Sequence, residues 1–186
     1  MEVEQTAIPE VLLIKPKLFG DERGFFQETF QAERYAEYGI GPLLQDNLSK
    51  SSRGVLRGLH YQLPDPQGKL VYVIEGEVLD IAVDIRLGSP SFGQWVGARL
   101  SGDNHHQLWV PEGFAHGFCV LSDYAIFAYK CSAYYKPEAE ISLRWDDPTF
   151  AIDWPIAEPS LSIRDAAALN FDDIPKNKLP HYIAPA

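Results

Sequence analysis

Cysteine is scarce in this chain, which has only Cys119 and Cys131 among its 186 residues. Two thiols in a chain of this length do not form a disulfide framework, so we expect both to be reduced and packed, as in a cytoplasmic protein. Long apolar runs are also missing, because none reaches the roughly 18 residues that a membrane-spanning helix needs. Residues 1–5 are acidic and lack the basic and apolar regions of a signal peptide. We therefore expect no membrane partner.

Basic residues are few as well, since 16 lysines and arginines stand against 26 acidic residues and give a net charge of -10. This balance excludes a general nucleic-acid binder, which carries a basic face. It does not exclude a small anionic ligand. Salt screens charges farther away than about 8 Å, so a local arginine cluster determines the electrostatic potential at a binding site. Hydrophobic residues make up 46% of the chain, which suits one packed domain over residues 1–186 with a surface tail from about 172 to 186.

The middle of the chain has the two-residue period of half-buried strands. Between Leu79 and Arg86, aliphatic residues alternate with Asp80, Asp84 and other small or charged residues. The apolar run 70–74 precedes this segment, and we expect 75–77 to form a tight hairpin turn because its central glycine tolerates positive φ. We expect further strands at 94–100, 107–110, 117–121, 125–134 and 141–145. Short strands with frequent turn signals predict a mainly β sandwich or barrel.

Helical patterns are limited to two short segments. One covers residues 30–38, with Thr29 as the expected N-cap and Gly39 as the stop signal. The other starts near Ser162, where Ser162-Ile163-Arg164-Asp165 fits a capping box. We therefore predict a mainly β protein with a few short helices.

Polar, basic and glycine residues are concentrated in residues 45–62. Strict strand alternation puts Gly58 and His60 on one face and Arg57 on the other, beside Val55. Gly58 would leave space for a ligand next to His60, and arginine suits a diphosphate because its planar fork makes bidentate contacts. The alternative is that Arg57 is a solvated strand residue and His60 a hydrogen-bonded core histidine.

The segment 111–118 contains the spacing Pro-x-Gly-x-x-His, which is similar to the second signature of the cupin barrels. Metal-binding cupins pair it with an earlier His-x-His and a downstream glutamate. Here the earlier segment offers only His60, which is followed by Tyr61 and Gln62. A transition-metal site normally needs three or four protein ligands, so we predict no metal.

Seven segments in order resemble the dTDP-4-dehydrorhamnose 3,5-epimerase family, and the resemblance spans about residues 7 to 169. They are residues 20–26, 45–47, 55–62, 68–71, 82–86, 90–93 and 111–118. The resemblance implies a cupin-type double-stranded β-helix, a jelly-roll barrel. It also implies a homodimer, a dTDP-sugar substrate and no cofactor. Residues 21–28 alone would fit a loop followed by an edge strand.

The resemblance implies epimerisation of dTDP-4-dehydro-6-deoxy-D-glucose at C3 and C5, giving dTDP-4-dehydro-L-rhamnose. The C4 ketone acidifies the protons on both neighbouring carbons. By similarity the base is His60, and histidine suits this task because its pKa lies near neutral.

Three more residues receive catalytic roles from the resemblance. Asp165 would orient the imidazole, although the capping box gives its carboxylate a purely local alternative. Tyr129 would return the proton from the opposite face, although a tyrosine in a strand is more often a packing residue. Lys69 would stabilise the enolate oxygen, although a surface lysine at the start of a strand is the plain alternative.

The resemblance also implies a set of substrate-binding residues. Arginines would hold the phosphates, and amide side chains would bind sugar hydroxyls and thymine. This set comprises Arg23, Glu28, Gln45, Asp46, Asn47, Arg57, His116, Glu140 and Arg164, with Phe26 as the aromatic residue that stacks on thymine. Three other functions compete with this hypothesis: a mono-epimerase acting at C3 or C5 only, a metal-dependent cupin, and a sugar-nucleotide binder without activity.

Overall fold

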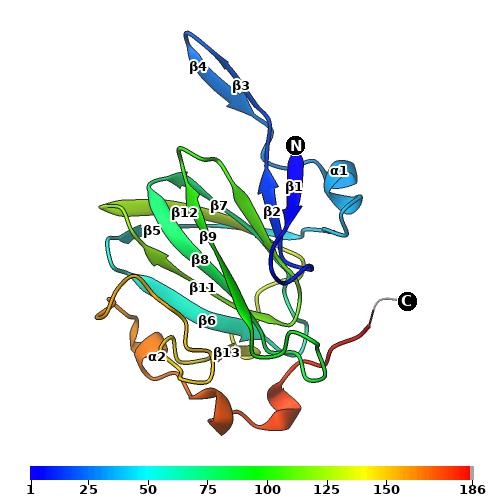
Figure 1. Cartoon of the computed structure of the whole chain (residues 1–186), viewed down its shortest axis with the longest axis vertical. Helices are drawn as coiled ribbons and strands as arrows, with labels where there is room; N and C mark the ends of the chain where they lie inside the picture. Colours follow the sequence, from blue (N-terminus) through cyan, green and yellow to red (C-terminus); the bar gives the residue numbers. More distant parts are fainter. Residues whose placement is uncertain (185–186) are drawn as a thin grey trace.

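Two antiparallel β-sheets face one another in the computed structural model, which describes residues 1–184 (Figure 1). The six-stranded sheet has the order β1-β2-β10-β7-β12-β5, and the five-stranded sheet has the order β13-β6-β11-β8-β9. The strands of the first sheet are β1 (Glu2–Gln5), β2 (Leu12–Lys15), β5 (Gln45–Ser52), β7 (Lys69–Glu75), β10 (Gln107–Val110) and β12 (Tyr124–Cys131). Those of the second are β6 (Leu56–Gln62), β8 (Glu77–Asp84), β9 (Trp95–Ser101), β11 (Phe114–Val120) and β13 (Glu140–Ser142). The prediction of a mainly β chain is confirmed.

Strand β8 is buried on both faces, and its two-residue alternation explains how the core is divided. Val78 and Ala82 belong to the cluster that fills the space between the sheets. Ile81 and Val83 belong to a second cluster on the outer face of the five-stranded sheet, which the C-terminal third of the chain covers. Asp80 has the same parity as Val78 and Ala82, so its carboxylate points between the sheets. A charged residue in that position requires a partner there.

The predicted strands appear with bounds shifted by a few residues. The turn between β7 and β8 lies where it was expected, and Gly76 there has φ 86°. A Cβ at this position would lie 2.1 Å from the carbonyl oxygen of Tyr124, so only glycine fits. The expected hairpin was wrong, because β7 and β8 belong to different sheets and do not pair. The largest differences are three residues: β11 starts at Phe114, before the expected 117, and β12 and β13 end at Cys131 and Ser142, before the expected 134 and 145.

The first helix is shorter than predicted, because α1 spans only Ala32–Ala36. The expected N-cap, Thr29, was wrong, and the cap is Gln31, whose side chain accepts a hydrogen bond from the backbone N–H of Arg34. The Thr29 carbonyl instead accepts from the Gln107 side-chain amide at 2.8 Å, which ties this segment to β10 before the helix begins. The second helix, α2 (Ile163–Ala166), starts at the expected N-cap, Ser162.

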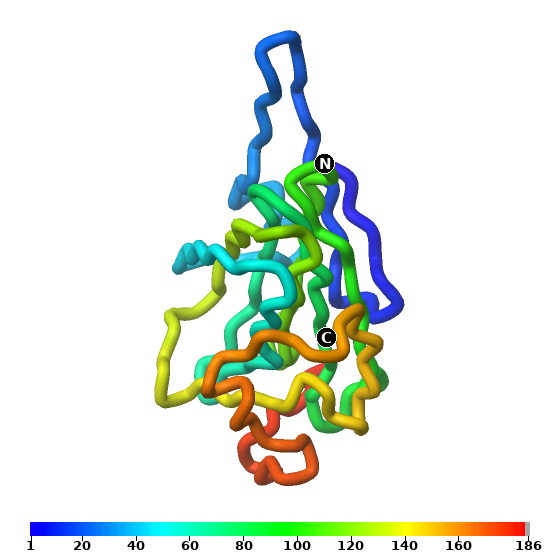
Figure 2. Tube along the Cα trace, turned by 90° about the vertical axis from the view of Figure 1, so that its left-hand side faces the viewer, coloured from blue at the N-terminus to red at the C-terminus, as the bar shows by residue number. Residues whose placement is uncertain are grey.

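A hairpin of β3 (Leu18–Asp21) and β4 (Gly24–Gln27) projects from the barrel, as Figures 1 and 2 show. It forms its own two-stranded sheet and pairs with neither of the larger ones. Its aromatic side chains are exposed: Phe25 by 62% and Phe26 by 68%. An isolated hairpin buries little apolar surface, and exposed aromatic side chains of this kind are typical of interaction surfaces.

The C-terminal segment lies against the outer face of the five-stranded sheet, with two 3-10 turns, η1 (Phe171–Asp173) and η2 (Lys176–Lys178). Ile174 and Leu179 are buried in the second core cluster, and His181 forms a parallel bridge with Leu87. The predicted surface tail is thus anchored up to this bridge, and its last two residues lie outside the described range. Over residues 1–184, no helix is long and apolar enough to span a membrane.

Candidate active site

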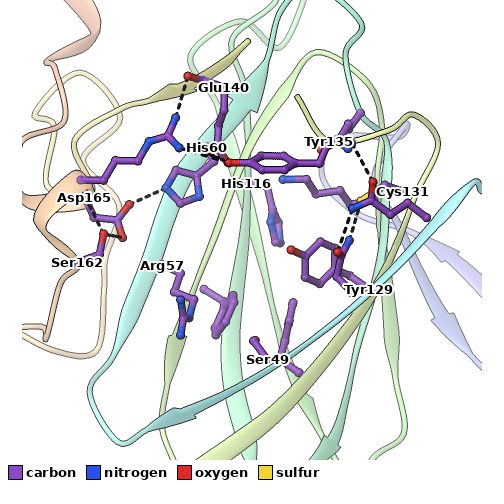
Figure 3. A pocket seen from close by; sticks show the side chains of 17 residues that line it. Ser49, Arg57, His60, His116, Tyr129, Cys131, Tyr135, Glu140, Ser162 and Asp165 are labelled. Carbon is purple, nitrogen blue, oxygen red and sulfur yellow. Dashed lines mark hydrogen bonds and ion pairs between the residues drawn. The ribbon is translucent and has the colours of Figure 1, made fainter. Parts of the chain in front are cut away.

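A cavity of about 350 Å³ opens between the two sheets, and residues of both sheets and of α2 line it (Figure 3). Arg57, His60 and His116 come from β6 and β11 of the five-stranded sheet. Lys69 and Tyr129 come from β7 and β12 of the facing sheet. Residues expected to bind substrate that also line it are Gln45, Asn47, Glu140 and Arg164, together with Asp165 of the expected catalytic group.

Strand β6 presents Arg57 and His60 to the same cavity although they are three residues apart. The ladder with β11 pairs His116 with His60 and Phe118 with Arg57, and its register shifts between these two pairs. Gly58 and Leu59 therefore stand opposite Gly117 alone, which is a β-bulge. The prediction that Arg57 lies on the face opposite to His60 was wrong, because it assumed unbroken alternation.

His60 forms a dyad with Asp165, with 2.6 Å between Nε2 and Oδ1 (Figure 3). An ionised carboxylate only accepts hydrogen bonds, so Nε2 carries the proton and the neutral ring keeps a lone pair on Nδ1. Burial opposes ionisation of Asp165, but hydrogen bonds from His60 and Ser162 outweigh it and hold the pKa of this carboxyl below its usual value. The carboxylate is 4% exposed and stays charged at neutral pH.

Asp165 is at the same time the third residue after a helix cap. The Ser162 hydroxyl accepts from the Asp165 N–H at 3.0 Å and donates to Oδ2 at 2.7 Å. One carboxylate oxygen therefore serves the local cap and the other faces His60. The two interpretations of this residue from the sequence are compatible in geometry.

Tyr129 lies across the cavity from His60, on the opposite sheet (Figure 3). Burial raises the pKa of its phenol, so the hydroxyl keeps its proton at neutral pH. Lys69 lies next to Cys131 in the β7–β12 ladder. Burial lowers the pKa of the Lys69 ammonium, while the nearby Cys131, Glu140 and Asp80 act in the opposite direction.

His116 lines the floor of the cavity and is itself paired with a carboxylate. Its Nε2 lies 3.0 and 2.9 Å from the two oxygens of Asp80, whose side chain is fully buried. The sequence pointed to His116 but not to Asp80. A charged residue in an alternating strand is expected to face solvent when one face of the strand is assumed to be exposed.

Tyr135 sits at the mouth of the cavity and was not predicted. Its hydroxyl donates to Glu140 Oε2 at 3.0 Å, and Arg164 pairs with the same carboxylate and donates to the Glu140 carbonyl at 2.9 Å. Two adjacent tyrosines, at 134 and 135, are a weak signal in the sequence, and alternation alone does not choose between them. Gln67 is a second unpredicted lining residue, held by a hydrogen bond to the Ala133 carbonyl at 2.8 Å.

Four predicted binding residues lie outside this cavity in their own chain. Asp46 points out of the barrel and forms an ion pair with Lys130 at 2.8 Å, because alternation on β5 turns it away from its neighbours Gln45 and Asn47. The other three, Arg23, Phe26 and Glu28, are on or next to the projecting hairpin. Arg23 pairs there with Asp21, and Glu28 pairs with Arg34.

Across residues 1–184 there is no group of three or more histidine, cysteine, aspartate or glutamate side chains placed to hold a metal ion. Each of the two cavity histidines is engaged by a single carboxylate. The arrangement instead offers the imidazole of His60 on one wall, and a protonated phenol and the side chain of Lys69 on the facing wall. Such a set suits removal of a proton beside a carbonyl and its return from the opposite face.

Comparison with known proteins gives a consistent result over most of the chain. A family profile described as dTDP-4-dehydrorhamnose 3,5-epimerase matches residues 5–173. The crystal structure of dTDP-6-deoxy-D-glucose-3,5-epimerase from Legionella pneumophila Philadelphia 1, in complex with dTDP-4-keto-L-rhamnose, is 58% identical with a TM-score of 0.96. That match covers 98% of this chain and 99% of the other, and it confirms the expected jelly-roll fold.

Curated relatives agree with the structural match. The dTDP-4-dehydrorhamnose 3,5-epimerase of Shigella flexneri is 54% identical over 93% of this chain and 97% of its own length. A protein of the same name from Neisseria gonorrhoeae is 52% identical over 96% of this chain, which spans only 55% of that relative. The 3'-monoepimerase ChmJ from Streptomyces bikiniensis is more distant, with 34% identity and a TM-score of 0.89 over 96% of this chain and 92% of that one.

Proposed function

Because this chain belongs to the dTDP-4-dehydrorhamnose 3,5-epimerase family, we propose that it converts dTDP-4-dehydro-6-deoxy-D-glucose to dTDP-4-dehydro-L-rhamnose in rhamnose biosynthesis. The observation that carries the proposal is the placement of His60 and Tyr129 on facing sheets of one cavity. An epimerase that inverts a carbon must remove a proton from one face and deliver another to the opposite face. The reaction takes place at C3 and at C5, on either side of the C4 ketone.

In the proposed first half-reaction, Nδ1 of His60 takes the proton from the carbon beside the ketone. The electrons of the broken C–H bond form a C=C bond, and the carbonyl electron pair moves onto the C4 oxygen. The Asp165 carboxylate, 2.6 Å from Nε2, stabilises the imidazolium that results. The Lys69 ammonium stabilises the developing negative charge on the oxygen.

In the second half-reaction, the Tyr129 hydroxyl gives its proton to the same carbon from the opposite wall. The enolate electrons then return to form the new C–H bond and restore the ketone. The raised pKa of the phenol keeps this proton in place until the enolate forms. His60 and Tyr129 exchange protons with solvent before the second carbon reacts.

We propose that the nucleotide lies along the mouth of the cavity. Arg57 and Arg164 supply positive charge for the diphosphate, while Gln45 and Asn47 offer amide donors and acceptors. Tyr135 is 43% exposed there and presents a ring on which thymine can stack. Within one chain it is better placed for this role than Phe26, which lies on the hairpin.

We further propose a homodimer in which the hairpin of one protomer reaches the cavity mouth of its partner. Two observations support it: the exposed aromatic side chains of the hairpin, and the distance of Arg23 and Glu28 from the cavity of their own chain. A two-fold dimer would exchange both hairpins at once and bury both apolar surfaces.

The free, buried thiols Cys119 and Cys131 fit a reducing compartment, and we propose that the enzyme acts in the cytoplasm.

The experiment that tests the function is incubation with dTDP-4-dehydro-6-deoxy-D-glucose in D₂O, followed by NMR of the product. Incorporation of deuterium at C3 and C5 with the L-rhamno configuration is the expected result. Deuterium at a single carbon would instead identify a mono-epimerase. The variant His60→Ala should bind dTDP as wild type does and lose exchange at both carbons; exchange at the wild-type rate would exclude His60 as the base.

A further inference from the structure

The reaction described above leaves one buried pair of ionisable groups without a role. His116 is 7% exposed and lines the cavity, and its partner Asp80 is fully buried next to it and does not line the cavity. Burying a carboxylate is costly unless it is paired and hydrogen-bonded. Two apolar side chains would fill the same space without this cost. The presence of His116 and Asp80 therefore calls for a role of their polar groups toward the cavity.

Asp80 fixes both the position and the tautomer of the His116 ring. Its two oxygens lie 3.0 and 2.9 Å from Nε2, so one N–H is shared between two acceptors. The ring also stacks on Phe127, with centroids 6.3 Å apart and planes at 25°. Burial raises the pKa of Asp80, while His116 and Lys69 act in the opposite direction. The ionised form of Asp80 only accepts hydrogen bonds, and in that form the proton is on Nε2 and Nδ1 of the neutral ring is a directed acceptor. No hydrogen bond within residues 1–184 involves this nitrogen.

His116 is also placed close to the reacting carbons. It pairs directly with His60 across the β6–β11 ladder, so the two imidazoles are neighbours on one wall of the cavity. A directed acceptor beside the base requires a donor on the substrate. The Lys69 ammonium and the Tyr129 hydroxyl already face the ketone and the reacting carbons in the proposed reaction.

The chemistry of the sugar leaves one donor that suits a fixed acceptor. The C4 position is a ketone and C6 is a methyl group, so neither donates a hydrogen bond. The C3 hydroxyl changes direction when C3 is inverted, and a rigid acceptor cannot follow it. The C2 hydroxyl keeps its configuration through both inversions and is therefore the group that a fixed acceptor can hold throughout.

Building on the proposed function, we propose that Asp80 is a positioning residue that directs Nδ1 of His116 to the C2 hydroxyl of the sugar. The pair thereby makes the enzyme selective for 2-hydroxy over 2-deoxy 4-keto sugars. A site built to bind a hydroxyl discriminates strongly against the analogue that lacks it, because the acceptor is then left buried without a partner.

The test compares dTDP-4-dehydro-6-deoxy-D-glucose with its 2-deoxy analogue, using kcat/KM for deuterium exchange in D₂O. We expect wild type to prefer the 2-hydroxy substrate by at least about 100-fold. Asp80→Asn keeps the shape of the side chain, but its amide can donate to Nε2 or accept from it, so it no longer fixes one tautomer. We expect this variant to reduce the preference to less than about 10-fold, chiefly by slowing the 2-hydroxy substrate. An unchanged preference in Asp80→Asn would overturn the proposal.

A matched control is Asp147→Asn, because Asp147 is also buried but lies outside the cavity. Its carboxylate accepts from the backbone N–H groups of Thr149 and Phe171, so its loss should lower Tm and leave the substrate preference unchanged. If Asp80→Asn does not fold, ¹⁵N NMR of the wild-type histidine rings gives an independent answer. A His116 ring protonated on Nδ1 alone would exclude the proposed acceptor. Absence of exchange by wild type on the 2-hydroxy substrate would instead contradict the proposed function.

Discussion

His60 and His116 are directly opposite one another on neighbouring strands, and each is hydrogen-bonded to a different buried aspartate. Asp165 reaches His60 from a helix after the barrel, while Asp80 reaches His116 from the adjacent strand β8. The two imidazoles thus share one wall but receive their orientation from independent elements. In the proposed reaction, this independence lets one ring move protons while the other holds the sugar.

The dual position of Asp165 gives a prediction that separates its catalytic role from its role in the helix cap. Asp165→Asn keeps a group that can accept from the Ser162 hydroxyl but removes the charge that stabilises the His60 imidazolium. We expect kcat to fall by about 10²- to 10⁴-fold with little change in Tm. The measurement is the rate of C5 deuterium exchange alongside thermal unfolding.

Ser162→Ala is the matched control for this experiment. It removes the N-cap and should destabilise the protein by about 1 kcal/mol while leaving most of the exchange activity. If Asp165→Asn and Ser162→Ala lower Tm equally and neither slows exchange beyond about 10-fold, Asp165 has only the local structural role.

Tyr129 gives a second prediction, which depends on its place on the wall opposite His60. Tyr129→Phe keeps the ring and its packing against Phe127 but removes the proton that the enolate receives. Proton loss to His60 should therefore continue, whereas formation of the inverted product should fall by about 10²-fold or more. NMR in D₂O measures both quantities in one experiment. Tyr135→Ala provides the comparison, because it removes the ring proposed to stack on thymine and should weaken dTDP binding rather than separate exchange from inversion. Equal losses of exchange and inversion in Tyr129→Phe would argue against an acid at this position.

The fold was largely predictable because it depends on local and repeated signals. The alternation in 79–86 and the glycine turn at Gly76 were enough to locate β8 and its start, but they did not show that β7 and β8 enter different sheets. The β-bulge at Gly58 was not predictable, because an extra residue in one strand is defined by its pairing with a partner strand far along the chain. It is this bulge that brings Arg57 and His60 to one side.

The residues of the candidate site that lie in family motifs could be predicted from the resemblance. Residues outside these motifs, such as Asp80, could not. The dyad partner Asp165 lies 105 residues from His60, so no spacing rule joins them without the family pattern. Asp80 looked like the polar half of a half-exposed strand, and nothing local reveals that both faces of β8 are covered. The hairpin residues carry a motif, but only a folded chain shows that they lie away from the cavity of their own protomer.

The proposed hairpin exchange predicts complementation between two inactive variants. Arg23→Ala leaves the cavity intact but damages the hairpin, whereas His60→Ala does the reverse. In a two-fold dimer with exchanged hairpins, half of the dimers formed by unfolding and refolding an equal mixture are mixed, and each mixed dimer contains one intact site. We expect recovery of about a quarter of wild-type activity. If each hairpin serves its own chain, no mixed site is intact and the mixture stays as inactive as its components.

The bulge on β6 gives a final prediction about how the site is held in register. At Gly58, φ is 117°, and an added Cβ would lie 2.6 Å from Gly117 Cα and from the His116 carbonyl oxygen. Gly58→Ala therefore has to push β6 away from β11, which moves Arg57 and His60 together and disturbs the pairing of His60 with Asp165. We expect a loss of at least about 2 kcal/mol of stability and of most exchange activity, measured by denaturant unfolding and NMR.

Gly88 separates backbone strain from this collision, because it also has positive φ, 85°, but an added Cβ there meets nothing within 4 Å. Gly88→Ala should cost only about 1 kcal/mol and should leave the exchange rate near that of wild type. Both variants force alanine into a left-handed conformation. The difference between their unfolding free energies and between their exchange rates therefore measures what the close approach of β6 and β11 contributes to the site. Equal effects of the two substitutions on activity would mean that the bulge does not set the position of His60.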